Sequence, residues 1–525
     1  MNSERRYYAL AMLEGIGVIA VELLSAKILA PYFGTSLIIW TTVIGITLVA
    51  LAGSYVLGAR LSKRQDRDRV LFVLFGIGAV ALAFMPEMGP LLFRLFSGLP
   101  LLLSVIVCAT FLLIPPIMGL GSTTPLLIQG ITREVTESGR VSGNVYAIST
   151  SGGIMTTFLL GFWVIPDWGV TKPCLLAAGI VLVFSGILLP KIQLSWRLAS
   201  GGAMTLALVW ALLPSGSGSD SVQVVFEQEG VLGQVKVVDL DAVDSLPKSR
   251  KLLFNGIPQT YMLKGDYSAT SNFNYVHMLA MLSSMKDPGS EVLLCGLGGG
   301  SLVMEYKRLG FKTDVVDIDW RLPLLGERYF YLDPKAFDFY VDDARHFIHE
   351  SPKRYDVITM DIALSESQPY HLYTVEAFEE FKRKLKPDGL LIMNFQGHFL
   401  GEEGRAERSI FRTLKEAGFE VHAIPSVGEG LQDVIFVASP TTVPFERLNV
   451  RRQNTCCINI AMADIFVQAP RTHIISNPDL NDAVVLRDDR PMLDLIRLPA
   501  VLQFRRNKIQ SIANKELESQ GKLFK

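Results

Sequence analysis

The sequence has few charged residues for its length, and the two signs nearly cancel. Charged side chains make up 19% of the 525 residues, and 50 Lys and Arg stand against 51 Asp and Glu, for a formal net charge of −1. Proteins that bind DNA or RNA need a basic stripe or patch that displaces phosphate counterions. The charge balance therefore predicts that nucleic acid is not a partner.

Cysteine is scarce and poorly spaced for metal binding. The five residues are Cys108, Cys174, Cys295, Cys456 and Cys457, and none of them forms a C-x-x-C pattern. The adjacent pair could bridge only under strain, and zinc sites need closely spaced Cys or His ligands. We therefore expect neither a disulfide framework nor a metal site.

Hydrophobic residues, by contrast, make up 49% of the chain and dominate the part before residue 214. Seven apolar runs there are long enough to cross a hydrocarbon core of roughly 30 Å. They are Tyr7–Leu29, Leu37–Leu57, Val70–Met85, Leu101–Leu120, Asn144–Ile165, Pro173–Leu189 and Leu198–Leu213. The pattern predicts an α-helical transmembrane bundle of about seven spans over residues 1–213. We expect a multi-pass protein of the bacterial inner membrane, with the lipid bilayer as a partner.

Basic residues are unevenly divided between alternate connections of these runs. One side has Arg5, Arg6, Arg60, Lys63, Arg64, Arg67, Arg69, Arg133, Arg140, Lys191 and Arg197, and the other has Lys27, Arg94 and Lys172. The positive-inside rule then places the N-terminus in the cytoplasm. An odd number of spans would carry the C-terminal half outside. The apolar stretch Thr123–Ile131 could be a re-entrant piece, so the span count stays open.

Two acidic residues lie within the first apolar run. Glu14 and Glu22 are eight positions apart, so they fall on roughly the same helical face. A carboxyl group at membrane depth is costly and often functional. The alternative is a hydroxyl or basic partner inside the bundle, with Lys27 as a candidate for Glu22.

The remainder of the chain has the composition of a soluble α/β protein. A Gly/Ser-rich linker, residues 214–221, is flexible by composition. Strand-like runs in residues 222–272 predict a small β subdomain. In residues 273–440, helical stretches alternate with short apolar strands, which predicts a doubly wound, mostly parallel sheet of the Rossmann-like type. Residues 441–525 form a C-terminal extension.

A glycine-rich turn follows the first of these strands. In "GLGGGS", Gly296, Gly298 and Gly300 would let the backbone approach a ligand closely. Asp317, which ends the next strand together with Asp319, lies about twenty residues later, where an acid is placed to accept the two hydroxyls of a ribose. A structural need for a tight turn is the other explanation of the glycines.

Two more acids follow the next two strands. Asp343 and Asp361 are expected at carboxyl strand ends, the edge where such sheets bind nucleotides. Asp343 could accept a hydrogen bond from the exocyclic amine of adenine. Each Asp could instead cap the helix that follows.

The order of these motifs resembles the spermidine synthase (polyamine aminopropyltransferase) family. The apolar N-terminal half is similar to that of the membrane-bound, fused branch of the family. Three strings add to the resemblance: "LFNGIPQ" at Leu253–Gln259, "LYTVEAF" at Leu372–Phe378 and "RDDRPMLD" at Arg487–Asp494. The resemblance implies a methyltransferase-type α/β fold and decarboxylated S-adenosylmethionine as co-substrate, with no metal.

The resemblance also implies roles for individual residues. Gln234 and Asp317 would hold the ribose side of the co-substrate, Asp343 its adenine, and Asp361 would be the general base that takes a proton from the attacking amine. The acceptor region would include Tyr275, His277, Leu364 and Tyr373.

Three positions depart from the family pattern. Gly299, His277 and Leu364 stand where the family has carboxylates that hold the amine. Unpaired ammonium groups in a desolvated site are costly, so we expect putrescine to be a poor acceptor.

Three functions fit these features. The first is a membrane-anchored aminopropyltransferase-like enzyme acting on a small-molecule amine or an unknown acceptor, with a homodimer as an open question. The second is an S-adenosylmethionine-dependent methyl or 3-amino-3-carboxypropyl transferase with a lipid or membrane-embedded acceptor. The third is a transporter or sensor whose soluble domain binds a nucleoside or polyamine without turnover.

Overall fold

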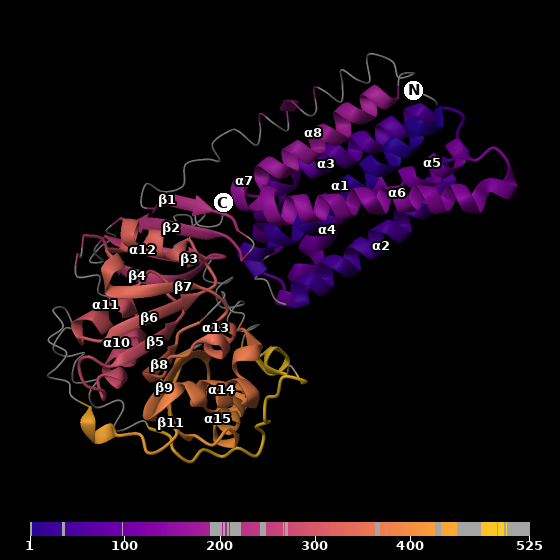
Figure 1. Cartoon of the computed structure of the whole chain (residues 1–525). Helices are drawn as coiled ribbons and strands as arrows, with labels where there is room; N and C mark the ends of the chain where they lie inside the picture. Colours follow the sequence, from indigo (N-terminus) through magenta and orange to yellow (C-terminus); the bar gives the residue numbers. More distant parts are fainter. Residues whose placement is uncertain are drawn as a thin grey trace. The chain divides into compact units, whose positions relative to one another are not determined.

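The computed structural model describes residues 3–33, 37–96, 98–189, 222–230, 232–241, 248–265, 271–362, 368–425, 432–448, 474–490 and 492–497, with a few isolated positions besides. These residues form two compact units. One is helical and built from the N-terminal region, and the other is an α/β unit built from Lys236 onward (Figure 1).

The helical unit contains, within the described residues, six helices long and apolar enough to cross a membrane. Its elements are α1 (Ser3–Phe33), α2 (Leu37–Leu61), α3 (Arg67–Phe96), α4 (Leu101–Gly121), α5 (Thr123–Ile131), α6 (Ser138–Leu159), α7 (Ile165–Trp168) and α8 (Thr171–Leu188). A π-helical turn at Leu160–Val164 joins α6 to α7. The expected seventh span, Leu198–Leu213, lies almost entirely outside the described residues.

The stretch considered as a re-entrant piece continues the fourth helix. A single residue, Ser122, separates the end of α4 from the start of α5. Together the two helices make one of the six long helices. Ser122 keeps helical dihedral angles, which is why the chain does not turn back there.

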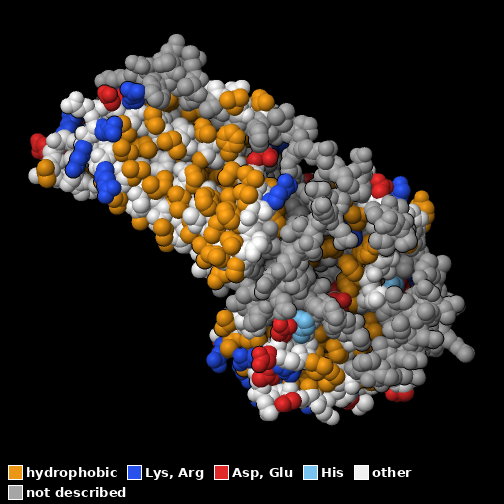
Figure 2. Space-filling view, turned by 180° about the vertical axis from the view of Figure 1, so that it is seen from behind, with side chains coloured by type: hydrophobic (Ala, Val, Ile, Leu, Met, Phe, Trp, Pro, Cys, Tyr) orange, Lys and Arg blue, Asp and Glu red, His pale blue; other side chains and the backbone are white. Residues whose placement is uncertain are grey.

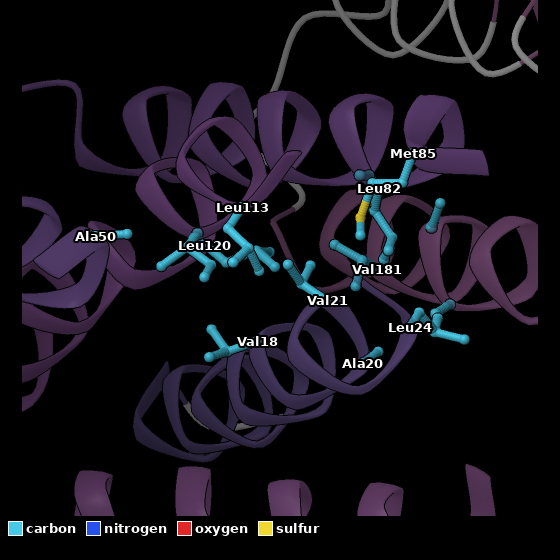
Figure 3. Packing of buried hydrophobic residues seen from close by; sticks show 14 of the residues in the cluster. Val18, Ala20, Val21, Leu24, Ala50, Leu82, Met85, Leu113, Leu120 and Val181 are labelled. Atoms are coloured by element: carbon cyan, nitrogen blue, oxygen red, sulfur yellow. The ribbon is translucent and has the colours of Figure 1, made fainter. Parts of the chain in front are cut away.

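Aliphatic side chains fill the centre of the helical unit (Figure 3). The labelled contributors include Val21 and Leu24 of α1, Leu82 of α3, Leu113 of α4 and Val181 of α8. Small residues bring α1 and α6 close together, as is common between membrane helices. A Cβ atom on Gly15 would lie only 1.9 Å from the carbonyl oxygen of Ser149.

The outer surface of the helical unit is apolar. Figure 2 shows hydrophobic side chains covering the visible face, with Lys and Arg gathered at one end of the unit. Exposed side chains include Leu48, Val49, Phe158 and Trp163. Contiguous apolar surface of this kind is rare on proteins that face water and is typical of an interaction with a membrane or a partner.

Glu14 is buried where α1 meets α6. The Ser149 hydroxyl donates a hydrogen bond of 2.5 Å to Glu14 Oε2, and the glutamate is 4% exposed. This is the arrangement with a hydroxyl partner that the sequence left open. Glu22, two turns further along α1, is half-buried.

A four-stranded sheet follows the linker region. Its strands are β1 (Val222–Gln228), β2 (Val235–Leu240), β3 (Ser249–Phe254) and β4 (Ile257–Leu263), in the order β1-β2-β3-β4. Asn255 and Gly256 join β3 to β4, and both have positive φ angles, 46° and 77°. Asn-Gly is the preferred pair for a two-residue hairpin because both positions need that conformation.

A seven-stranded sheet forms the centre of the α/β unit. Its strands are β5 (Glu291–Cys295), β6 (Lys312–Asp317), β7 (Phe337–Val341), β8 (Tyr355–Met360), β9 (Leu385–Gly397), β10 (Glu420–Pro425) and β11 (Gln432–Ser439), in the order β10-β11-β9-β8-β5-β6-β7. Strands β5 to β9 pair in parallel, whereas β11 is antiparallel to both β9 and β10. The sheet is therefore mixed, and this is the Rossmann-like methyltransferase fold.

Helices provide the crossovers that parallel strands require. They are α11 (Ser301–Arg308), α12 (Leu322–Phe330), α13 (Ala344–Glu350), α14 (Val375–Lys384) and α15 (Arg405–Glu416), whereas α10 (Asn274–Ser283) precedes β5. The strand order reverses at β5, which has β6 on one side and β8 on the other. Ligands of open α/β sheets bind at such a switch point, beyond the carboxyl ends of the strands.

Candidate active site

A pocket of about 350 Å³ lies at this switch point. The glycine-rich turn after β5 and the ends of β6, β8 and β9 contribute to its wall. Its acidic side chains are Asp317, Asp319, Asp342, Asp343, Asp361 and Asp433. The described residues that line it include no Lys and no Arg. The lining is therefore rich in acidic side chains, of which Asp319 pairs with Arg321 at 2.7 Å and Asp343 with His371 at 2.9 Å.

The glycine-rich turn is shaped by the absence of side chains. Gly296, Gly298 and Gly300 have φ angles of 95°, 55° and 88°. A Cβ atom on Gly296 would lie 2.3 Å from the carbonyl oxygen of Asp361. Gly296 and Gly298 line the pocket, whereas Gly300 begins α11 and packs against Leu332.

Asp317 holds this turn against the end of β6. Its Oδ2 accepts a hydrogen bond from the Leu297 amide at 2.8 Å, and its Oδ1 accepts one from the Asp319 amide at 2.9 Å. Burial raises the pKa of Asp317 to about 6, although these backbone hydrogen bonds oppose the shift. Each carboxylate oxygen keeps a second acceptor site that a ligand hydroxyl could use.

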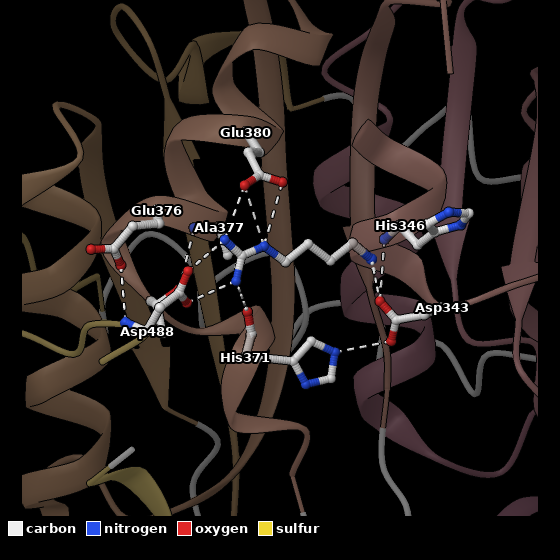
Figure 4. Close-up of polar contacts among 9 residues, drawn as sticks. Asp343, His346, His371, Glu376, Ala377, Glu380 and Asp488 are labelled. Carbon is white, nitrogen blue, oxygen red and sulfur yellow. Dashed lines mark hydrogen bonds and ion pairs between the residues drawn. The ribbon is translucent and has the colours of Figure 1, made fainter. Parts of the chain in front are cut away.

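Asp343 has the geometry of a helix cap and also lines the pocket. Its Oδ1 accepts hydrogen bonds from the amides of Arg345 and His346, at 2.9 and 3.2 Å, as the N-cap of α13. Its Oδ2 lies 2.9 Å from His371 Nε2 (Figure 4). The hydrogen bond with His371 keeps the pKa of Asp343 below its ordinary value.

The guanidinium of Arg345 is held by acidic residues outside the pocket. It donates to both oxygens of Asp488 at 2.7 Å and to Glu380 at 2.9 Å, as Figure 4 shows. It also donates to the carbonyl oxygen of His371 at 3.1 Å. Asp488 belongs to the "RDDRPMLD" string, which thereby ties the C-terminal region to α13 and α14.

Asp361 lies directly after β8, beside the glycine-rich turn. Its Oδ1 accepts a hydrogen bond from Asn394 Nδ2 at 3.2 Å, and the hydroxyl of Tyr275 also faces it. Burial raises the pKa of Asp361 to about 7, with a further increase from the charge of Asp433. A carboxyl group with a pKa near neutrality is suited to accept a proton in a reaction.

Besides Gly300, four of the predicted site residues do not line the pocket or lie outside the described residues. Gln234 is not among the described residues that line the pocket, and its amide donates to Glu227 at 3.0 Å. His277 and Tyr373 are also not among them. Leu364 lies outside the described residues.

The side chains of His277 and Tyr373 are both buried. His277 Nε2 lies 2.8 Å from the carbonyl oxygen of Ser271, and its Nδ1 lies 3.6 Å from Glu305 of α11. Tyr373 is fully buried and donates to Gln368 Oε1 at 2.9 Å. Tyr275, two residues before His277, does line the pocket.

The structure explains why Gly299 carries no carboxylate. Its amide donates to Thr260 Oγ1 at 2.7 Å, and a Cβ atom there would lie 2.8 Å from Thr260 Cγ2. The side chain of Thr260, from β4, therefore occupies the space that a larger residue would need.

The pocket residues that reasoning from the sequence missed include Asp433 and Asn394. Asn394 lies near the end of the long strand β9, and Asp433 is the second residue of β11. Because β11 is antiparallel to β9, its amino end reaches the edge where the parallel strands have their carboxyl ends. A search of that edge that includes the starts of antiparallel strands would have found Asp433.

Fold and pocket together define a Rossmann-like α/β domain of the methyltransferase type with an acidic ligand site. Residues 272–443 match the Spermine/spermidine synthase domain. This part of the chain is therefore similar to a family of transferases.

Individual relatives agree with this assignment. A polyamine aminopropyltransferase from Vibrio vulnificus is 31% identical over 147 residues, which are 26% of this chain and 49% of that protein. An N-terminal histidine N-methyltransferase from Emericella nidulans is 30% identical over 158 residues, 28% of each chain. The chain thus spans less than half the length of these two curated relatives. Among solved structures, a probable spermidine synthase from Corynebacterium glutamicum is 18% identical with a TM-score of 0.39, covering 52% of this chain and 97% of that chain.

Proposed function

We propose that the domain transfers an aminopropyl group from decarboxylated S-adenosylmethionine to an amine acceptor. The observation that carries this proposal is the charge of the pocket, which six aspartates line without a Lys or Arg among its described residues. Both reactants of such a transfer are cations, since one has a sulfonium and an ammonium group and the other is an ammonium ion. A concave site lined by one sign of charge attracts ligands of the opposite sign.

The same charge favours the decarboxylated co-substrate over S-adenosylmethionine itself. The α-carboxylate of S-adenosylmethionine would enter an acidic pocket in which no described lining residue is a Lys or an Arg. Arg345, the basic residue beside Asp343, already binds Asp488 and Glu380. Decarboxylation removes the group that this pocket disfavours.

The nucleoside end would be formed by the glycine-rich turn with Asp317 and Asp343. Asp317 would accept hydrogen bonds from the ribose hydroxyls, and Asp343 would face the adenine. Replacing Asp317 by Ala should weaken binding of methylthioadenosine tenfold or more, because a charge-assisted hydrogen bond is worth about 1.5–3 kcal/mol. Calorimetry measures this, and an unchanged affinity would contradict the ribose assignment.

The chemistry requires a deprotonated amine next to the activated carbon. Asp361 would take one proton from the acceptor ammonium, and the nitrogen lone pair would then attack the carbon beside sulfur. The carbon–sulfur bond breaks with its electron pair going to sulfur, which leaves neutral methylthioadenosine and a secondary ammonium product. The reaction is an in-line displacement, so the alignment of nitrogen, carbon and sulfur by the pocket contributes much of the rate.

A second candidate is transfer of a methyl group from S-adenosylmethionine to a nitrogen. The similarity to the N-terminal histidine N-methyltransferase favours it. Asp361 could serve as the base in that reaction too, but the described lining of the pocket offers no Lys or Arg for the α-carboxylate.

The products distinguish the two reactions. The purified full-length protein in lipid nanodiscs is incubated with either nucleoside and a set of primary amines, and the nucleoside products are identified by mass spectrometry. We expect methylthioadenosine from the decarboxylated compound in the presence of an amine. Formation of S-adenosylhomocysteine with no methylthioadenosine would overturn the proposal in favour of methyl transfer.

We also propose that the helical unit anchors the domain in the bacterial inner membrane. The six long apolar helices and the uneven distribution of Lys and Arg support this. An even number of crossings would return the domain to the cytoplasmic side, together with the N-terminus. Reporter fusions after Arg64 and after Ser221 should then both report the cytoplasm, and opposite sides would contradict an even count.

A further inference from the structure

The acceptor end of the pocket contains a second carboxylate, Asp433, besides Asp361. Strands β9 and β11 pair so that Asp433 lies opposite Gln396. Asn394 is two residues from Gln396 on β9, so the three side chains share one face of the sheet. All three line the pocket. The start of β11 therefore brings a negative charge beside the end of β8.

Asn394 connects the two carboxylates. Met360 of β8 pairs with Met393 of β9, so Asp361 and Asn394 are level at the point where β8 ends. Asn394 Nδ2 donates to Asp361 Oδ1 at 3.2 Å, and the same side chain also interacts with Asp433. Since β9 lies between β8 and β11, the carboxylates approach Asn394 from opposite sides.

The two acids interact electrostatically with each other. Burial raises the pKa of Asp433 to about 6, and the charge of Asp433 adds to the increase in the pKa of Asp361. The other groups that face Asp361 are Tyr275 and Asn394, and neither is a cation. A pair of this kind is stabilised when a cation binds between its members.

We propose that Asp433 is the second acceptor-binding carboxylate, so that a protonated primary alkylamine binds between Asp361 and Asp433 before it reacts. The reaction step of this inference rests on the proposed function, whereas the binding of the amine does not. Asp361 accepts one proton from the bound ammonium, and Asp433 stays ionised beside the nitrogen. The secondary ammonium that forms after the carbon–sulfur bond breaks then keeps a carboxylate partner.

Asp433 also explains how an amine could bind although other residues stand where the resemblance predicts carboxylates. Thr260 fills the space beside Gly299, and His277 lies against Ser271 and Glu305. An ammonium ion in a desolvated site without acidic partners would be costly. A carboxylate from a different strand supplies the missing charge.

The test compares Asp433→Asn with wild type in the full-length protein. The amide keeps the size of the side chain and its hydrogen bonding to Asn394, but not the charge. Putrescine and butylamine are titrated calorimetrically into protein saturated with methylthioadenosine. We expect the variant to bind both amines at least tenfold more weakly while its affinity for methylthioadenosine stays within twofold.

A kinetic readout separates acceptor binding from a structural role. In the variant, KM for the amine should rise at least tenfold while KM for the decarboxylated nucleoside does not change. The acid limb of kcat/KM should also move to lower pH, since Asp361 loses a neighbour of like charge. Asp338→Asn, an exposed position on β7, removes the same charge elsewhere and should behave as wild type.

The outcomes for Asp433 and for the reaction can be told apart. Equal amine affinity of wild type and Asp433→Asn, or no amine binding by wild type, would overturn the role of Asp433. Weaker amine binding by the variant, with no methylthioadenosine formed by wild type, would support Asp433 while contradicting the proposed aminopropyl transfer.

Discussion

Replacing Asp361 by Asn should lower turnover by about 10²–10⁴-fold, the usual contribution of a general base. The amide has the same shape and can accept a hydrogen bond from Asn394, but it cannot take a proton from the acceptor ammonium. Affinity for methylthioadenosine should stay nearly constant, because the ribose and adenine contacts are assigned to Asp317 and Asp343 and the amide keeps the shape of the Asp361 side chain. Single-turnover kinetics and calorimetry measure the two quantities separately.

The pH dependence of the wild type gives an independent check. The pKa of Asp361 is raised to about 7 by burial and by Asp433, so kcat/KM should fall as the pH drops below about 7 and the base becomes protonated. A bound ammonium stabilises the carboxylate, so the corresponding limb of kcat should lie at lower pH. The Asn variant should lose the dependence assigned to Asp361.

Asp361→Asn should lower activity without lowering the stability of the folded protein above pH 7. A carboxyl group whose folded pKa exceeds its unfolded value favours folding below the unfolded pKa, and this contribution is lost as the pH rises through about 7. The neutral Asn variant should therefore be at least as stable as wild type above pH 7.

If Asp361 were only a cap, Asn would be close to neutral in turnover, since Asn caps as well as Asp. That result would remove the general-base assignment.

Gly296→Ala should have the second largest effect. The added Cβ would lie 2.3 Å from the carbonyl oxygen of Asp361, at a φ angle of 95°. Either the turn or the end of β8 must move, and displacements of about 1 Å at a reacting centre can cost on the order of 10²-fold in rate. We expect turnover to fall about 100-fold or more and methylthioadenosine binding to weaken as well.

Gly289→Ala is a matched control for that substitution. Gly289 has a similar φ angle, 88°, but a Cβ atom there would meet nothing within 4 Å. Both variants carry the cost of a left-handed conformation, roughly 1–2 kcal/mol, so both should unfold at a lower temperature than wild type. Only Gly296→Ala should lose activity. Equal activity of the two variants would show that the close approach to Asp361 is not required.

Several features of the fold could be predicted because they depend on local pattern. Apolar runs with the length of a membrane span became the six long helices of the described region. Alternating strands and helices indicated the α/β sheet, and the rule for parallel strands placed Asp317, Asp343 and Asp361 at one edge. All three line the pocket. In these cases the position of a residue within its own strand decides where it lies.

Other features depend on contacts between segments distant in the sequence. His277 and Tyr275 are two residues apart on α10, yet only Tyr275 lines the pocket, because residues two apart on a helix face in different directions. Asp343 caps α13 and at the same time binds His371 of a later turn. The role of the "RDDRPMLD" string, in which Asp488 binds Arg345, also required the tertiary structure.

By itself, the sequence determined that an apolar helical region precedes a Rossmann-like domain with a glycine-rich turn and acids at its strand ends, because hydrophobic periodicity and turn residues act within short windows. It did not place Asp433 in the pocket. The antiparallel pairing of β11 with β9 decided that position, since it reverses the chain direction and brings Asp433 to the same edge as Asp361. Strand direction is set by which edges pair in the folded sheet, and no local pattern around Asp433 encodes it.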